Sequence, residues 1–102
     1  MNKFILNTTF VTERALQDKL TSWLEGVYLK AAENTGLFTG RRMVQVLTDD
    51  NPEAFSIACE LQCESLSEAV RWHDDTASLL RQDMTNRWGE RVLWFTTYLR
   101  VI

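Results

Sequence analysis

The sequence predicts an α+β protein in which four strands form one antiparallel sheet and two helices cover one face of it. Three observations lead to this prediction. Apolar residues alternate in four short segments, as in strands, and recur at helical spacing in two longer segments. The six segments follow one another in the order β-α-β-β-α-β. The chain has 102 residues, enough for one modest core, so we expect a single domain over residues 1–102.

The first strand is expected over Lys3–Val11, where apolar and polar residues alternate. Thr12 offers an N-cap side chain and Glu13 a negative charge for a first turn, so a helix should begin there. The helix should run to about Asn34, because its apolar residues keep helical spacing: Leu16, Leu20, Trp23, Leu24, Val27 and Ala31. Gly36 is well placed to end it in a left-handed conformation.

The next two strands should form a hairpin. The first is expected over Arg42–Thr48 and the second over Phe55–Cys63, with Asp49–Glu53 as the turn by composition. The second has the cleanest alternation in the chain. Its apolar face carries Phe55, Ile57, Cys59, Leu61 and Cys63.

Cys59 and Cys63 are the only cysteines of the chain. Four residues apart in one strand, they are separated by about 13 Å, whereas a disulfide needs Cα atoms within about 7 Å. Because both share the apolar face, we expect buried free thiols. A metal site would need further Cys or His ligands, and only His73 is available, so we expect no metal and no cofactor.

The segment Ser65–Glu68 matches the capping box and predicts the start of the second helix. Gly89 should end this helix. One stripe of it carries Leu66, Val70, His73, Ala77, Leu80, Met84 and Trp88.

The final segment, Val92–Ile102, is rich in β-branched and aromatic residues and predicts the fourth strand. Successive side chains of a strand point to opposite faces, so both faces here would be apolar. One face carries Leu93, Phe95, Leu99 and Val101, and the other carries Trp94, Tyr98 and Ile102. We expect the first face to pack on the helices. Trp94 and Tyr98 would then form a dimer or ligand face, covered by a second copy or by a bound molecule.

Two β-α-β units with right-handed crossovers define the ferredoxin-like arrangement, in which both helices lie on one face of the sheet. The other face is bare, and a second copy would cover it as in the dimeric α/β barrels. We therefore expect a homodimer.

Charge and hydropathy exclude two classes of partner. The net charge is −3, and no basic cluster exceeds the pair Arg41-Arg42, so nucleic acid is not an expected partner. No apolar run approaches the roughly 20 residues of a membrane helix, and the apolar start is too short for a signal peptide. We expect a cytoplasmic protein.

Four short segments of the chain resemble a small bacterial family, domain of unknown function 4286. They are Thr35-Gly36-Leu37-Phe38, Arg42 to Leu47, Phe95-Thr96-Thr97, and Arg87-Trp88-Gly89, which is similar to the family's Arg-Phe-Gly. The resemblance covers nearly the whole chain and implies a fold similar to the dimeric α/β barrels, with no established activity. The chain departs from the family pattern where histidine or proline is typical, having Tyr28, Lys30, Thr76 and Met84. Histidine chemistry of relatives therefore does not carry over.

An enzymatic alternative comes from the dimeric α/β barrels, which include haem-degrading and quinone-forming monooxygenases. Some of these are similar to this chain in having Asn, Trp and His, here Asn7, Trp72 and His73, in a cavity between sheet and helices. Trp72 and His73 are adjacent, however, and cannot share one helix face. As the only histidine, on an apolar stripe, His73 is more typical of a packed core residue than of a base or ligand.

The remaining charged clusters have ordinary explanations. Asp49, Asp50 and Glu53 suit a turn, and Asp74-Asp75 suits the polar face of a helix. The arginines that could bind an anion near strand ends are better explained as surface charges: Arg41, Arg42, Arg87, Arg91 and Arg100. The sequence thus favours a homodimeric, non-catalytic binding or interaction module, with a monooxygenase of the dimeric α/β-barrel class as the alternative.

Overall fold

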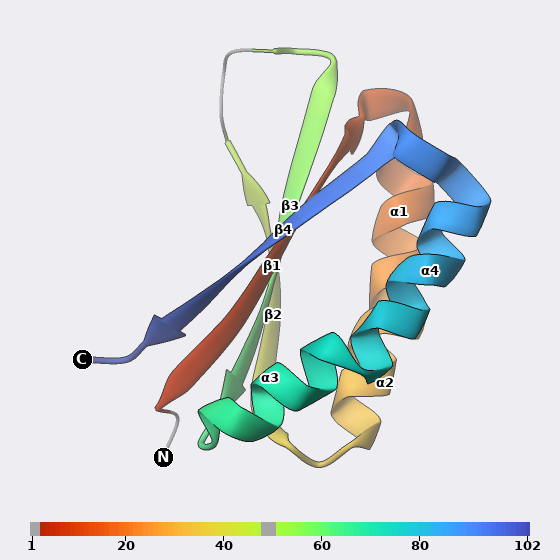
Figure 1. Ribbon diagram of the computed structural model, residues 1–102. Helices are drawn as coiled ribbons and strands as arrows, with labels where there is room; N and C mark the ends of the chain where they lie inside the picture. The colour runs from red at the N-terminus through yellow and green to blue at the C-terminus, as the bar shows by residue number, and fades with distance from the viewer. Residues whose placement is uncertain (1–2, 48–50) are drawn as a thin grey trace.

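The computed structural model describes residues 3–47 and 51–102. The strands are β1 (Phe4–Glu13), β2 (Phe38–Val46), β3 (Ala54–Cys63) and β4 (Val92–Arg100). The first helical segment comprises α1 (Gln17–Trp23), a π-helical turn (Leu24–Tyr28) and α2 (Leu29–Asn34), and the second comprises α3 (Leu66–Asp74) and α4 (Thr76–Trp88). The antiparallel sheet has the order β2-β3-β1-β4, and both helical segments lie on one side of it (Figure 1). The predicted β-α-β-β-α-β fold is confirmed.

The register of β4 against β1 decides which face of the last strand meets the helices. Leu6, Thr8 and Phe10 of β1 are completely buried on the helix side. Their partners in β4 are Tyr98, Thr96 and Trp94, in that order. Directly paired side chains point to the same face, so Trp94 and Tyr98 lie on the helix side.

The predicted assignment of the two faces of β4 was therefore wrong. Leu93, Phe95 and Leu99 pair with Val11, Thr9 and Ile5 and lie on the open face of the sheet. Because both faces of this strand are apolar, alternation alone contains no information about which one faces inward. The structure leaves Leu93 and Phe95 60% and 57% exposed.

The first helical segment begins later than predicted. β1 continues through Glu13, and a single 3₁₀ turn (Arg14–Leu16) leads into α1. The hydroxyl of Thr12 is not an N-cap, since it donates to the carbonyl of Arg91 at 2.8 Å, tying β1 to the start of β4. The predicted end is confirmed, because α2 stops at Asn34 and Gly36 adopts φ 74°.

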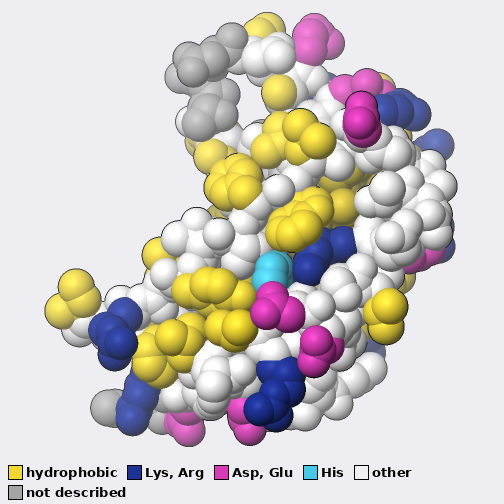
Figure 2. All heavy atoms as spheres, viewed as in Figure 1, with side chains coloured by type: hydrophobic (Ala, Val, Ile, Leu, Met, Phe, Trp, Pro, Cys, Tyr) yellow, Lys and Arg dark blue, Asp and Glu magenta, His cyan; other side chains and the backbone are white. Residues whose placement is uncertain are grey.

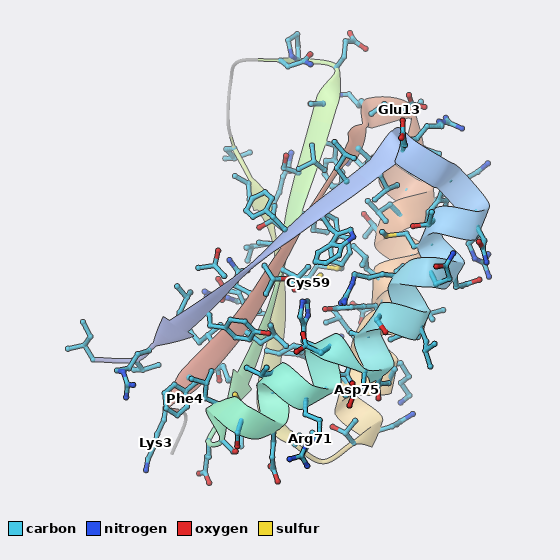
Figure 3. All side chains as sticks on the ribbon, viewed as in Figure 1. Lys3, Phe4, Glu13, Cys59, Arg71 and Asp75 are labelled. Atoms are coloured by element: carbon cyan, nitrogen blue, oxygen red, sulfur yellow. The ribbon has the colours of Figure 1, made fainter. Side chains whose placement is uncertain are left out.

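The second helical segment has the predicted ends but an unpredicted break. Ser65 accepts a hydrogen bond from the backbone N–H of Glu68 at 3.3 Å, which confirms the N-cap. Gly89 ends α4 at φ 57°. Between α3 and α4, Asp75 has φ −95° and ψ −71°, and the helix is interrupted there; Asp75 is labelled in Figure 3.

The hairpin is confirmed with different strand limits, since β2 begins at Phe38 rather than Arg42. The apolar face of β3 is buried as expected, including free Cys59 and Cys63 at 1% and 2% exposure. Part of the predicted turn, Asp49 and Asp50, lies outside the described residues. In the rest of the turn, the side-chain oxygen of Asn51 accepts a hydrogen bond from the backbone N–H of Glu53.

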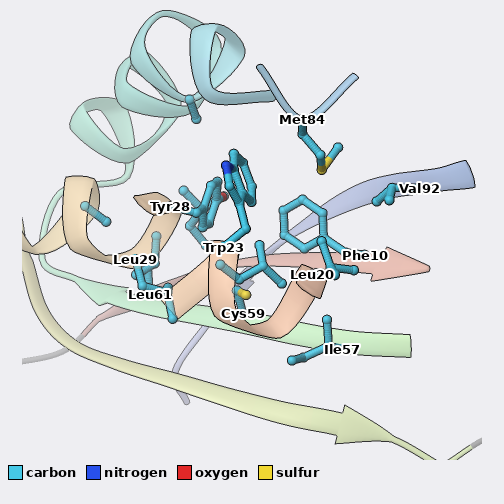
Figure 4. Close-up of a cluster of buried hydrophobic side chains, with 14 of the residues drawn as sticks. Phe10, Leu20, Trp23, Tyr28, Leu29, Ile57, Cys59, Leu61, Met84 and Val92 are labelled. Carbon is cyan, nitrogen blue, oxygen red and sulfur yellow. The ribbon is translucent and has the colours of Figure 1, made fainter. Parts of the chain in front are cut away.

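Tyr28 belongs to the π-helical turn, and its completely buried side chain lies at the centre of the core (Figure 4). Its ring makes edge contacts with Phe10 at 5.3 Å and Trp72 at 5.6 Å between centroids. Burial raises the pKa of its hydroxyl to about 12. Tyr28 is therefore one of the core side chains that join the sheet to both helical segments.

Candidate ligand site between the helices and the last strand

Four side chains meet where α3 and α4 face β4: His73, Arg81, Trp94 and Tyr98. The imidazole of His73 lies edge-on to both aromatic rings, at 5.7 Å from Trp94 and 6.1 Å from Tyr98 between centroids. The guanidinium of Arg81 lies over the indole of Trp94 at 4.2 Å from its centroid. We call these four residues the His73–Arg81 cluster.

Arg81 is an unusual residue for a helix core, since it is only 7% exposed. One of its terminal nitrogens donates to the backbone carbonyl of His73 at 2.9 Å, and the other lies 3.2 Å from His73 Nδ1. Within residues 3–47 and 51–102, the structure places no carboxylate within ion-pair distance of this guanidinium. The exposed Asp74 acts only from farther away, raising the pKa of Arg81 against the larger lowering by burial.

His73 is held in one protonation state by the same contact. An arginine has only donors, so Nδ1 of His73 must be the acceptor and the neutral ring carries its proton on Nε2. Burial and the charge of Arg81 lower the pKa of His73. The ring is therefore a neutral hydrogen-bond donor at physiological pH.

The outer wall of the cluster is aromatic and accessible. Trp94 and Tyr98 are 40% and 39% exposed, although both lie on the helix side of the sheet. In Figure 2 the buried imidazole, in cyan, is visible between a basic side chain, an acidic side chain and hydrophobic ones. Burial raises the pKa of Tyr98, so its hydroxyl stays neutral.

A hollow of about 310 Å³ adjoins the cluster on the indole of Trp94, between the end of α4 and the start of β4. Its lining consists of Thr85, Gly89, Glu90, Val92, Leu93 and Trp94. Thr85 follows Arg81 by one helical turn. This volume lies at the lower end of the range for small-molecule sites.

The structure does not bring together the residues of the enzymatic alternative. Asn7 pairs with Thr97 and Glu60 on the open face, so the sheet separates it from Trp72 and His73. Trp72 turns toward Phe38 and Tyr28, whereas His73 turns toward β4. Sequence reasoning missed Arg81, although it lies on the stripe that includes Ala77 and Met84, both completely buried. A charged residue at a core position of this stripe was the available signal.

The surface arginines are paired rather than gathered at one site. Arg41 contacts Glu25 and Glu33, Arg42 contacts Glu60, Arg87 contacts Asp83, and Arg91 contacts Glu13. The guanidinium of Arg100 lies over the ring of Phe4. These contacts agree with the prediction of ordinary surface charges.

In the described part of the chain, no three His, Cys, Asp or Glu side chains are grouped so that they could hold a metal ion. None of the helices found there is long and apolar enough to cross a membrane.

The fold and the two faces of its sheet define a ferredoxin-like protein. It is similar to a dimeric ferredoxin-like protein from an uncultured marine organism, at 13% identity and a TM-score of 0.67, over 100% of this chain and 97% of the other. It is also similar to a monooxygenase from the gene ActVA-Orf6 of Streptomyces coelicolor, solved with nanaomycin D. That match has 18% identity and a TM-score of 0.69, over 99% and 88% of the two chains.

The family is identified by sequence. The profile of the family described as "Domain of unknown function (DUF4286)" matches residues 3–102, so the chain belongs to this family. No curated protein matches the chain in sequence. HapK from Hahella chejuensis is a further structural neighbour, with 7% identity and a TM-score of 0.67 over 98% and 92% of the chains.

Proposed function

We propose that this protein is a cytoplasmic, homodimeric, non-catalytic binding module whose two copies associate through the open faces of their sheets. The observation that carries the proposal is the exposure of three large apolar side chains on that face. Leu93, Phe95 and Leu99 are 60%, 57% and 39% exposed. Monomers rarely leave such a contiguous patch in water. The buried free thiols of Cys59 and Cys63 suit a reducing compartment.

The patch continues across the neighbouring strand. Ile5 and Val11 of β1, both half-buried, stand directly beside Leu99 and Leu93 in the register. A phenylalanine buries on the order of 150–250 Å², so two copies of this patch supply a large part of a stable interface.

A second copy also suits the polar part of the open face. The side-chain oxygen of Asn7 is buried there without a hydrogen-bond partner among the residues that the structure describes. Beside it, Arg42 and Glu60 form an ion pair across β2 and β3. A two-fold partner brings an identical mixture of donors, acceptors and apolar groups, which is how isologous interfaces become self-complementary. The dimeric description of one structural neighbour supports the same proposal.

The enzymatic alternative rests on the likeness to the Streptomyces monooxygenase. Its expected constellation of Asn7, Trp72 and His73 is divided between two faces of the sheet and two sides of α3. A monooxygenase would therefore have to use other residues, because His73, whose Nδ1 accepts from Arg81, is placed as a hydrogen-bond donor and not as a base. We place this alternative second for that reason.

Light scattering on the purified protein tests the dimer. We expect the mass of two chains for the wild type and of one chain for Phe95→Glu, because the substitution places a charge in the contact. Leu79→Glu is a matched control, since Leu79 is 73% exposed but lies on α4. It should remain dimeric, and circular dichroism should show that both variants are folded. A wild-type mass of one chain at tens of micromolar, or a dimeric Phe95→Glu variant, would contradict the proposal.

A further inference from the structure

We propose that the His73–Arg81 cluster and the adjoining hollow bind a small aromatic carboxylate, with Arg81 as the anchor of its acidic group and Trp94 as the surface on which its ring stacks. The cluster itself lies on the helix side of the sheet and within one chain. The adjoining hollow shares one residue, Leu93, with the proposed dimer contact on the open face.

The first step of the argument is the charge of Arg81. Burying an ion is costly unless an opposite charge or a full set of hydrogen bonds compensates it. The other arginines in the ion pairs described above have carboxylate partners at the surface. Among the described residues, the direct contacts of buried Arg81 are instead a carbonyl oxygen, an imidazole nitrogen and the face of an indole, with the charge of Asp74 acting from farther away. An anion at this position would supply the missing charge.

The second step is the number of donors. A guanidinium has five N–H groups in a rigid planar fork, and His73 occupies two of them. Three remain for other acceptors. Two parallel N–H groups match the two oxygens of a carboxylate, which makes this the acidic group that arginine binds with the best geometry. The Nε2 proton of neutral His73 provides a further donor in the same cluster.

The third step is the aromatic wall. The rings of Trp94 and Tyr98 flank His73 and are about two-fifths exposed, which is far more than the core rings of Phe10 and Tyr28. Exposed, fixed aromatic faces next to a cation favour a planar ligand with an acidic substituent. The hollow against Trp94 is about 310 Å³, enough for one or two fused rings. Glu90, which also lines the hollow, disfavours negative charge on the part of the ligand that lies there.

The test uses 2-naphthoate as the probe and 2-naphthamide as its neutral, nearly isosteric counterpart. Binding is followed by the NMR shift of the indole N–H of Trp94, assigned with Trp94→Phe, and by calorimetry. We expect 2-naphthoate to bind and to shift this resonance, and 2-naphthamide to bind at least about tenfold more weakly. Equal binding of the two probes, or no binding of 2-naphthoate up to millimolar concentration, would overturn the proposal.

Variants then test whether Arg81 is the residue that binds the carboxylate of 2-naphthoate. Arg81→Gln should remove the preference for the acid over the amide, while Arg87→Gln, the same change at an exposed position of the same helix, should keep it. If Arg81→Gln does not fold, Trp94→Leu is decisive, because this half-exposed ring can be removed without opening the core. Trp94→Leu should weaken the binding of 2-naphthoate by about tenfold. An unchanged affinity would contradict the role of Trp94 as the stacking surface.

Discussion

Burial of the Cys59 thiol should make the fold sensitive to alkali. Its side chain is 1% exposed, and desolvation, helped by the charge of Glu25, raises the pKa of Cys59 from 9.0 to about 12. Above pH 9 the unfolded chain therefore releases a proton that the folded chain retains. Stability falls as pH rises, because ionisation then favours the unfolded state. The loss is about 1 kcal/mol at pH 10 and about 4 kcal/mol when pH reaches 12.

Urea unfolding at pH 8 and pH 10 measures this effect. Cys59→Ala should be less stable than the wild type at pH 8, because a buried sulfur is lost, but it should lose about 1 kcal/mol less between the two pH values. Comparing each variant with itself removes the constant cost of the substitution. Tyr28, whose pKa is raised to about 12 mainly by burial and to a smaller extent by Cys59, stays neutral in the folded protein at pH 10. An identical pH dependence in the two proteins would refute the reasoning.

Two further predictions concern caps and glycines. Ser65→Ala should lower the free energy of unfolding by about 1 kcal/mol, because the N–H of Glu68 loses its acceptor. Denaturant unfolding measures this loss. An unchanged midpoint, or an equal loss for Ser67→Ala, would place the cap elsewhere. Gly89→Ala should cost about 1–3 kcal/mol, because φ 57° and ψ −137° strain any residue with a Cβ. Gly26→Ala in the first helical segment, where a Cβ meets nothing within 4 Å, should instead gain about 1 kcal/mol. Thermal melts of the two glycine variants that shift in the same direction would contradict this pair.

Local rules predicted the parts of the fold that depend on local chemistry. Ser65 caps its helix because the cap needs only the next three residues, and Gly36 and Gly89 end helices because positive φ costs glycine little. β3 was assigned to its correct face because its alternation of apolar and polar residues is unambiguous. The order of the elements followed from the same short-range patterns.

The choice of face for β4 depended on the tertiary structure, since both of its faces are apolar. Only the pairing with β1 places Trp94 and Tyr98 on the helix side of the sheet. Their neighbours in β1 are buried in the core: Leu6, Thr8 and Phe10. The candidate site depended on the same pairing. Arg81 and Trp94 lie thirteen positions apart on different elements and meet because α4 packs across β4.

The sequence by itself thus determined the α+β class, the order of the elements and the ends of most helices, because propensity, capping and periodicity act over a few residues. Only the tertiary structure decided which apolar face remains open and which charged side chain is buried. The local pattern puts Arg81 on a core stripe of its helix but does not reveal its partners, and no local pattern around Phe95 decides which face it takes, because both depend on neighbours from other elements.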